Sequence, residues 1–421
     1  MKRYYLWTIG CQMNDSDAMR IEHGLAEMGF SPIPQPTEAD LVILLTCVVR
    51  QSAEDKVVGR LSSLKHLRRS NPRACIVVMG CFVDNEQTLS ARFPYVDAFF
   101  KPSDIEGLLQ FARQSLAAVP EPQAYPLALP VCAYVPISYG CDHHCTYCIV
   151  RLRRGRQRSR LLPEIVAEVC GLVQNGVREV SLLGQNVDAY GQDLPPGAPD
   201  LADVLVALEE IPELWRIRFL TSHPGDMSQK LIETVANSAK VCPHFELPVQ
   251  SGDDLILQRM GRHYTVAQYR SLIAAIRERI PSCSIATDVI VGFPGESNAQ
   301  FQATCDLIAS LRFDAVHIAK YSPRPGTPAA RLPDDVPPEE KERRRALLEE
   351  LQTQISSEIN AALLGQCVEV LVEEQHRGRW RGRTVTNKLV FFADAADRRG
   401  QLVTVEITHT GPWSLLGRIV R

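Results

Sequence analysis

Three cysteines placed close together are the strongest chemical signal in this 421-residue chain. Cys141, Cys145 and Cys148, the loop cysteines, stand in the run CDHHCTYC with C-x3-C-x2-C spacing. Three thiolates on one short loop can ligate three irons of a [4Fe–4S] cluster and leave the fourth iron open for a substrate or cosubstrate. The alternative is a structural zinc site with His143 or His144 as fourth ligand, although no second C-x2-C pair follows at zinc-finger spacing.

A second set of cysteines is dispersed along the first part of the chain. Cys11, Cys47 and Cys81, the strand-end cysteines, are 36 and 34 residues apart, and each lies at or just beyond the end of an expected parallel strand. In open α/β sheets those ends converge on one crevice where ligands bind. The three thiols could therefore meet and hold a second cluster with an open iron, although cysteines so far apart are more often simply buried.

Three blocks of secondary structure must position these cysteines. Up to about residue 118, apolar strands at Tyr4–Thr8, Leu41–Thr46 and Cys75–Gly80 alternate with helical patterns. This alternation predicts an open, doubly wound α/β domain. A linker with four prolines between Val119 and Val131 follows.

The second block repeats the strand–helix alternation six times, which predicts a partial (βα)6 barrel with its chemistry at the carboxyl ends of the strands. The expected strands are Ala133–Ser138, Glu179–Gly184, Ile217–Thr221, His244–Val249, Ser284–Val291 and Ala315–Tyr321. After a charged helix at Pro338–Leu364, short alternating strands predict a small antiparallel β-barrel of about 60 residues.

The composition, with 45% hydrophobic and 23% charged residues, is that of a globular chain rather than a disordered or coiled-coil one. No apolar run approaches the roughly 20 residues that a membrane span needs, and no signal peptide is recognisable. We therefore expect a cytoplasmic protein without a membrane partner. In a reducing compartment, thirteen cysteines argue against a disulfide framework, and those that cluster argue for metal binding or catalysis.

The net charge of −3 indicates no nucleic-acid partner, but two local patches are strongly basic. Arg151–Arg160 holds six arginines in ten residues, and Arg377–Arg383 holds four. Arginine pairs with phosphates and stacks on bases, so we expect RNA contacts there, with a solvated or salt-bridged surface as the alternative. The expected RNA-binding residues are Arg154, Arg156, Arg158, Arg160, Arg379, Trp380, Arg381 and Arg383.

The loop cysteines, which follow a strand and have an aromatic residue before the last cysteine, resemble those of the radical S-adenosylmethionine superfamily. The resemblance implies that S-adenosylmethionine binds the open iron and is cleaved to a 5′-deoxyadenosyl radical. It also implies that Tyr147 approaches the adenine of the cofactor. The other implied cofactor contacts are Gly184, Gln185 and Asn186 after the second strand and Gly292, Phe293 and Gly295 after the fifth. The Gln-Asn pair departs from the commoner Gly-Glu, which puts the detail of that contact in doubt.

With the strand-end cysteines added, essentially all 421 residues resemble the radical S-adenosylmethionine methylthiotransferases, and most closely their tRNA branch. The motifs that carry the resemblance are GCQMN at Gly10–Asn14, LLGQNVDAYG at Leu182–Gly191, RIRFLTSHP at Arg216–Pro224, LPVQSGDD at Leu247–Asp254, DVIVGFPGE at Asp288–Glu296 and YSPRPGTPAA at Tyr321–Ala330. The resemblance implies a methylthiotransferase N-terminal domain at 1–118, a radical core at 127–357 and a TRAM RNA-binding barrel at 360–421.

The resemblance further implies an enzyme with two [4Fe–4S] clusters, one on the loop cysteines and one, for sulfur insertion, on the strand-end cysteines. The reaction would convert N6-isopentenyladenosine at position 37, beside the tRNA anticodon, to its 2-methylthio form. The implied partners are the tRNA anticodon loop, an electron donor such as flavodoxin or ferredoxin, and a sulfur donor. The alternatives are threonylcarbamoyladenosine in tRNA, a ribosomal-protein aspartate, or a non-catalytic RNA-binding protein with structural zinc.

Overall fold

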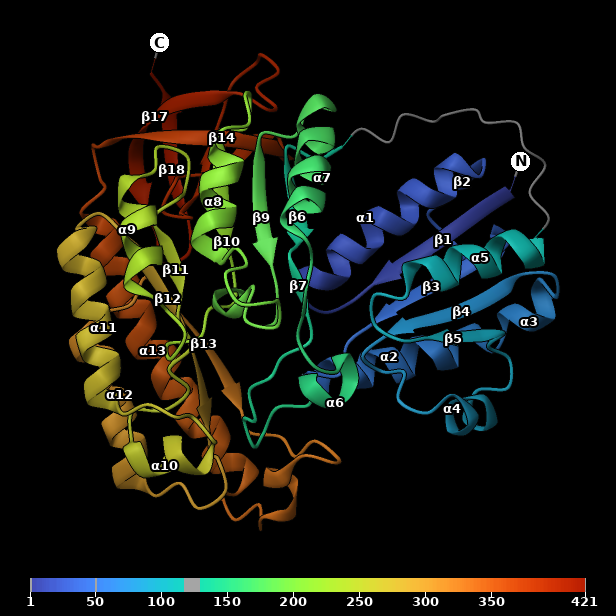
Figure 1. Cartoon of the computed structure of the whole chain (residues 1–421), viewed down its shortest axis with the longest axis horizontal. Helices are drawn as coiled ribbons and strands as arrows, with labels where there is room; N and C mark the ends of the chain where they lie inside the picture. Colours follow the sequence, from blue (N-terminus) through green and yellow to red (C-terminus); the bar gives the residue numbers. More distant parts are fainter. Residues whose placement is uncertain (1, 50, 117–128, 421) are drawn as a thin grey trace. The chain divides into compact units, whose positions relative to one another are not determined.

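The structure, a computed structural model, describes residues 2–49, 51–116 and 129–420 (Figure 1). The chain divides into two compact units. The first holds the described residues before 129 together with Tyr139–Asp142 and Cys148–Arg156. The second holds Leu129–Ser138, His143–Tyr147 and the described residues from Gln157 onward. The expected proline-rich linker lies almost entirely outside the described residues.

The first unit contains a parallel sheet of order β2-β1-β3-β4-β5 (Figure 1). Its strands are β1 (Lys2–Thr8), β2 (Phe30–Pro32), β3 (Leu41–Thr46), β4 (Cys75–Gly80) and β5 (Ala98–Phe100). The connecting helices are α1 (Gln12–Glu27), η1 (Pro36–Glu38), α2 (Gln51–Leu64), α3 (Leu67–Ser70), α4 (Glu86–Arg92) and α5 (Ile105–Leu116).

Both faces of this sheet are covered by helices. Along β3, Ile43 packs in the cluster that contains α1 and α5 side chains, whereas its neighbour Leu44 packs with those of α2 and α4. All six residues of β3 are buried, as a central parallel strand requires. The prediction of a doubly wound α/β domain is therefore confirmed.

The core of the second unit contains the six expected parallel strands, in two sheets of order β10-β9-β6 and β11-β12-β13. They are β6 (Cys132–Pro136), β9 (Glu179–Leu183), β10 (Arg216–Phe219), β11 (His244–Glu246), β12 (Ser284–Val291) and β13 (Ala315–Lys320). The helices of this unit are α7 (Leu162–Gln174), η2 (Val187–Ala189), α8 (Leu201–Glu209), α9 (Gln229–Asn237), α10 (Asp254–Arg259), α11 (Val266–Arg279), α12 (Asn298–Leu311), η3 (Pro328–Arg331) and α13 (Pro338–Ala361). Between β6 and α7 lie the short elements β7 (Ser138–Tyr139), α6 (Val150–Arg154) and β8 (Arg158–Ser159).

The last part of the chain forms a closed barrel of order β14-β15-β16-β18-β17. Its strands are β14 (Cys367–His376), β15 (Arg379–Arg383), β16 (Leu389–Phe392), β17 (Leu402–Thr410) and β18 (Leu415–Ile419). Strand β15 was not among the expected strands, because its segment was interpreted only as a basic patch that contacts RNA. The alternation Arg-Trp-Arg-Gly-Arg has the period of a strand, and it buries Trp380 and Gly382 while the arginines point away from the barrel core.

Two buried arginines of β10 join the barrel to the core of the second unit. Arg216 Nη1 donates to the carbonyl of Arg383 at 2.7 Å, and Arg218 Nη2 donates to the carbonyl of Thr384 at 2.8 Å. Arg218 also pairs with buried Glu179, with 2.9 Å between Nε and Oε1. Because both side chains are almost inaccessible to water, the barrel carbonyls replace the hydration that these cations lose.

Candidate functional site

The strand-end cysteines lie at one edge of the first sheet. Strands β1, β3 and β4 are adjacent and parallel, and Thr46 at the end of β3 pairs with Gly80 at the end of β4. Cys47 and Cys81 directly follow these two residues. Cys11 follows β1 and caps the N-terminus of α1. The topology thus brings together three thiols that are far apart in the sequence.

Two glycines permit this close approach. Gly10 precedes Cys11 with a φ of +135°, and a Cβ there would lie 2.6 Å from the Cβ of Cys47. Gly80 precedes Cys81 with a φ of +118°, and a Cβ there would lie 2.3 Å from the carbonyl oxygen of Thr46. Larger residues would be excluded at both positions by sterics and by backbone conformation.

The donor set of the strand-end cysteines fits a bound iron–sulfur cluster, provided that the metal displaces protons from buried thiols. Burial raises the pKa of the Cys47 thiol to about 11, and the neighbouring Cys11 and Cys81 also act to raise it. Burial also raises the pKa of Cys81, against an opposing effect of Arg154. Such thiols stay protonated at neutral pH until a metal displaces the proton, and a donor set of three thiols suits iron–sulfur ligation.

The structure places Arg154 beside these cysteines. Its guanidinium hydrogen-bonds to the side chain of Cys81. It also donates to Asn14 Oδ1 at 3.3 Å and to Ser103 Oγ at 3.2 Å. These donors are engaged within the first unit, and the expectation that Arg154 contacts RNA stays a prediction.

The loop cysteines lie on a segment shared by the two units. Cys141 and Cys148 belong to the first unit and Cys145 to the second. Within the second unit, Arg262 Nη1 lies 3.6 Å from the Sγ of Cys145. Arg262 is held in place by its Nη2, which donates to the carbonyl of Pro248 at 2.8 Å, and by its Nε, which donates to the Tyr264 hydroxyl at 2.9 Å.

A group of two histidines and two polar residues holds the middle of this loop. His143 Nε2 lies 2.5 Å from Asp226 Oδ2, and the His143 ring stacks on that of His223 with 3.8 Å between centroids. Asn186 donates to the same Asp226 oxygen at 2.6 Å. His143, His223 and Asp226 could together hold a metal ion by distance. The sequence analysis gave no site role to His223, although this residue lies in the RIRFLTSHP motif. Asp226 was missed because a hydrogen-bond partner 83 residues away from His143 leaves no local signal.

The predicted cofactor contacts lie at the carboxyl ends of the strands in the second unit. Buried polar atoms without a hydrogen-bond partner in the described part of the chain gather there, namely Ser138 Oγ, Asn186 Oδ1 and His223 Nε2. Gly184 adjoins Ser138, since a Cβ on Gly184 would lie 2.5 Å from the Ser138 Oγ. Buried unsatisfied groups of this kind fit a polar ligand such as the amino-acid part of S-adenosylmethionine.

The two aromatic residues expected near the adenine lie in one apolar cluster. Phe293 is fully buried against Tyr321, with 5.3 Å between ring centroids, and Tyr147 packs against the same cluster. The flanking Gly292 and Gly295 have φ values of +71° and +74°. Because the Phe293 ring is covered, this turn can offer a cofactor only its backbone.

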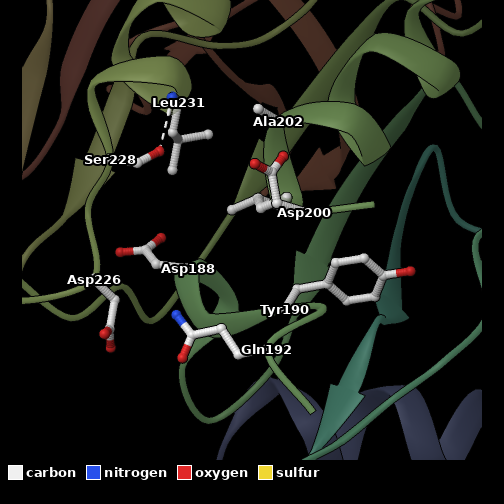
Figure 2. A pocket seen from close by; sticks show the side chains of 9 residues that line it. Asp188, Tyr190, Gln192, Asp200, Ala202, Asp226, Ser228 and Leu231 are labelled. Atoms are coloured by element: carbon white, nitrogen blue, oxygen red, sulfur yellow. Dashed lines mark hydrogen bonds between the residues drawn. The ribbon is translucent and has the colours of Figure 1, made fainter. Parts of the chain in front are cut away.

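A cavity of about 140 Å³ lies next to Asp226 (Figure 2). Its lining includes Asp188, whose carboxylate accepts hydrogen bonds from Ser222 Oγ at 2.9 Å and from the backbone N–H of His223 at 3.1 Å. Burial raises the pKa of Asp188 to about 7. Asp188 thus fixes the loop that carries His223, a role that the sequence did not reveal.

The remaining expected RNA-binding residues fall into two groups. Arg156, Arg158 and Arg379 are exposed. The others are engaged within the protein: Arg160 with Glu168, Arg381 with Glu374, Arg383 with Glu373, and Trp380 in the barrel core. Trp380 is 8% exposed, and its expected RNA contact stays a prediction. The expectation that Arg160, Arg381 and Arg383 contact RNA also stays a prediction, with all three side chains ion-paired inside the protein.

Models of three families match the chain: the radical SAM superfamily at residues 135–308, the uncharacterized protein family UPF0004 at 3–101 and the TRAM domain at 361–420. Among solved structures, the chain is similar to the radical S-adenosylmethionine methyltransferase TsrM from Kitasatospora setae, with a TM-score of 0.57 and 14% identity over 78% of this chain and 77% of that one. A likeness at this identity concerns the fold alone. The predicted domain boundaries at 118, 127, 357 and 360 remain predictions.

Similarity to curated proteins extends over the full chain. A tRNA-2-methylthio-N(6)-dimethylallyladenosine synthase of Roseiflexus sp. (strain RS-1) is 50% identical over 100% of this chain and 90% of its own length. The synthase of the same name from Dehalococcoides mccartyi (strain ATCC BAA-2266 / KCTC 15142 / 195) is 46% identical over 100% of this chain and 99% of its own. With two three-cysteine sets in its sequence and this identity from end to end, the chain belongs to the radical SAM family of tRNA-2-methylthio-N(6)-dimethylallyladenosine synthases.

Proposed function

We propose that this chain adds a methylthio group to carbon 2 of N6-isopentenyladenosine at position 37 of tRNA, next to the anticodon. The observation that carries the proposal is the pairing of two three-cysteine sets in a chain half identical, along its full length, to synthases named for this product. One S-adenosylmethionine supplies the methyl group and a second supplies the radical.

The chemistry requires two different iron–sulfur sites. A hydrogen on an adenine carbon is too inert for protein acids and bases, so its removal needs a radical from a cofactor. A cluster on the loop cysteines would supply the electron for cofactor cleavage. A cluster on the strand-end cysteines would supply the sulfur that is inserted. The protein itself positions these ligands, through Gly10 and Gly80 at one set and Arg262 at the other.

The residues near Cys145 provide the polar groups for the cofactor. Asp226 orients His143 and Asn186, and both lie where the strands of the second unit end. In this proposal the open hydrogen-bonding capacity of Asn186 and His223 serves the amino-acid part of S-adenosylmethionine, while Gly184, Gln185 and the backbone at Gly292 and Gly295 complete its pocket. Tyr147 approaches the adenine.

Arg156, Arg158 and Arg379 are the proposed tRNA contacts, because they are the members of the predicted set that are exposed. Changing Arg156 and Arg158 together to Gln should weaken tRNA binding several-fold and lower its salt dependence, since each phosphate contact adds to the salt slope. Arg381→Gln is the matched control, because that arginine pairs with Glu374. Equal losses in both proteins would contradict the assignment.

The proposed partners are the tRNA anticodon loop, a low-potential electron donor such as flavodoxin or ferredoxin, and a sulfur donor. No helix within the described residues is long and apolar enough to cross a membrane. Since the substrate is tRNA and the clusters need a reducing compartment, the proposed location is the cytoplasm.

Mass spectrometry of tRNA nucleosides from cells that lack this chain tests the function. We expect N6-isopentenyladenosine to accumulate and its 2-methylthio form to disappear, and both changes to reverse when the gene is restored. Loss of methylthio-threonylcarbamoyladenosine or of a methylthio-aspartate instead would move the substrate to one of the alternatives. After anaerobic reconstitution, about eight irons per chain are expected, whereas zinc alone would overturn the enzymatic proposal.

A further inference from the structure

The segment that follows the loop cysteines is anchored in the first unit. Helix α6 begins two residues after Cys148 and ends at Arg154. Ile149 is 5% exposed and packs in the apolar cluster of α2 and α4. Arg153 Nη1 lies 3.1 Å from Asp84 Oδ2. These contacts fix the end of α6, and therefore Arg154, with respect to the strand-end cysteines.

The hydrogen-bond partners of Arg154 come from the loops that carry those cysteines. Asn14 uses its Nδ2 to hold the carbonyls of Ile9 at 2.7 Å and Thr46 at 3.1 Å, just before Cys11 and Cys47. Its Oδ1 is thereby left to accept from Arg154 at 3.3 Å. Ser103 accepts from Arg154 and donates to Asp17 Oδ2 at 3.0 Å. The neutral acceptors Asn14 and Ser103 thus orient the guanidinium, and its remaining donors are available to Cys81.

Arg154 places a positive charge among these groups. It interacts electrostatically with Cys11, Cys81 and Asp17, and its charge acts to lower the pKa of Cys47. Arg20 also acts on Asp17. Asp17 is 2% exposed, and burial raises its pKa even though Arg154 acts in the opposite direction. A guanidinium stays charged under all ordinary conditions. A fixed cation therefore lies next to three thiols that would become thiolates on binding iron.

We propose that Arg154 is a positioning residue for the cluster on the strand-end cysteines, donating a hydrogen bond to the Cys81 sulfur and compensating the negative charge of the three thiolates. The inference rests on the proposed function, which places a cluster there. Hydrogen bonds to sulfur and the local net charge set the reduction potential of an iron–sulfur cluster. Arg154 therefore raises this potential and slows the loss of iron.

The test uses the full-length chain with Cys141, Cys145 and Cys148 all changed to Ala, so that reconstituted iron reports on the strand-end cysteines alone. In this parent, Arg154→Gln is compared with Arg69→Gln, which removes an equal charge from an exposed position on α3. We expect Arg154→Gln to shift the EPR-monitored midpoint potential to a lower value and to lose iron to a chelator several-fold faster. Arg69→Gln should match the parent.

Arg154→Lys keeps the charge but not the planar fork of donors, so its potential should lie between those of the parent and Arg154→Gln. If circular dichroism shows that Arg154→Gln does not fold, Arg154→Lys carries the test. A potential and an iron-loss rate equal to the parent's, in whichever variant folds, overturn the inference. Weaker tRNA binding with unchanged cluster properties also overturns it, because Arg154 would then be an RNA contact. A parent that binds no cluster overturns the proposed function itself, which a failure at Arg154 alone does not.

Discussion

The strand-end cysteines and the loop cysteines, the two proposed cluster sites, are assembled by opposite structural routes. The first set comes from three adjacent strands, and its geometry depends on sheet register and on two glycines. The second set occupies eight consecutive residues, and its geometry depends on side chains that hold the loop from outside, such as Arg262 and Asp226. The first site is therefore encoded by topology and the second by spacing, so mutations should damage them differently.

The largest expected effect comes from changing one cysteine of each set to alanine, which distinguishes the roles of the two sites. Cys145→Ala should abolish cleavage of S-adenosylmethionine, because the loop set then lacks a ligand. Cys47→Ala should stop methylthiolation but spare some cleavage, because the loop set is intact. Detection of 5′-deoxyadenosine by chromatography, together with iron analysis of both proteins, checks this prediction. Full methylthiolation by Cys47→Ala would refute the assignment of the strand-end site.

Gly80→Ala tests how strictly the strand-end site depends on its backbone. The new Cβ would lie 2.3 Å from the Thr46 carbonyl oxygen at a φ of +118°, so we expect a loss of about 3 kcal/mol in the free energy of unfolding. Gly59→Ala in α2 is the control, because nothing lies within 4 Å of its Cβ position. It should be neutral or stabilising by up to about 1 kcal/mol. Chemical denaturation measures both, and equal stabilities would contradict the described packing.

The free energy of unfolding should depend on pH through Asp188, which lines the cavity next to Asp226. Burial raises the pKa of Asp188 to about 7, so between pH 4 and pH 7 the folded chain holds a proton that the unfolded chain has released. Stability should therefore fall as pH rises through this range, by about 2 kcal/mol between pH 5 and pH 7. Asp188→Asn should flatten this slope in urea unfolding of the apoprotein. Part of the slope should remain, because burial also raises the pKa of Glu246 to about 7.

The smallest expected effect tests whether side chains from elsewhere in the second unit hold the loop that carries Cys141, Cys145 and Cys148. Asp226→Asn weakens the acceptor of His143 and Asn186, so cofactor cleavage should slow about tenfold, the lower end of the effects seen for side chains that orient groups around a metal site. Asp200→Asn is the control, since Asp200 lines the same cavity but pairs with Lys230 at 3.0 Å. Single-turnover assays would compare the cofactor-cleavage rates of the two variants. A normal rate in Asp226→Asn would show that the loop keeps its conformation without the Asp226 carboxylate.

The elements of the fold were largely predictable, since β3, β4 and β12 have the bounds that their apolar runs predict. Strand β15 was missed because its three arginines dominated the interpretation, although its period of two was present in the sequence. The topology brings the strand-end cysteines together, as their placement after successive strands predicts.

The partners of charged side chains were not predictable. Arg154 and Arg160 belong to the same basic segment as Arg156 and Arg158, yet the first pair is engaged inside the protein and the second is exposed. Sequence composition cannot distinguish these cases, because the acceptors Asn14 and Glu168 are defined only by the folded chain. Asp226 was missed for the same reason, because its neighbours in the sequence give no indication that it contacts His143.

The way in which Arg216 and Arg218 dock onto the barrel has a genetic consequence. A premature stop codon near residue 360 would delete the carbonyls of Arg383 and Thr384 and also expose the two guanidiniums to water, which would hydrate them in place of these acceptors. A barrel that stayed in place without presenting the carbonyls would be more damaging, because uncompensated buried charges are strongly destabilising. Grafting a foreign barrel at this position would therefore succeed only if it supplied the same carbonyls.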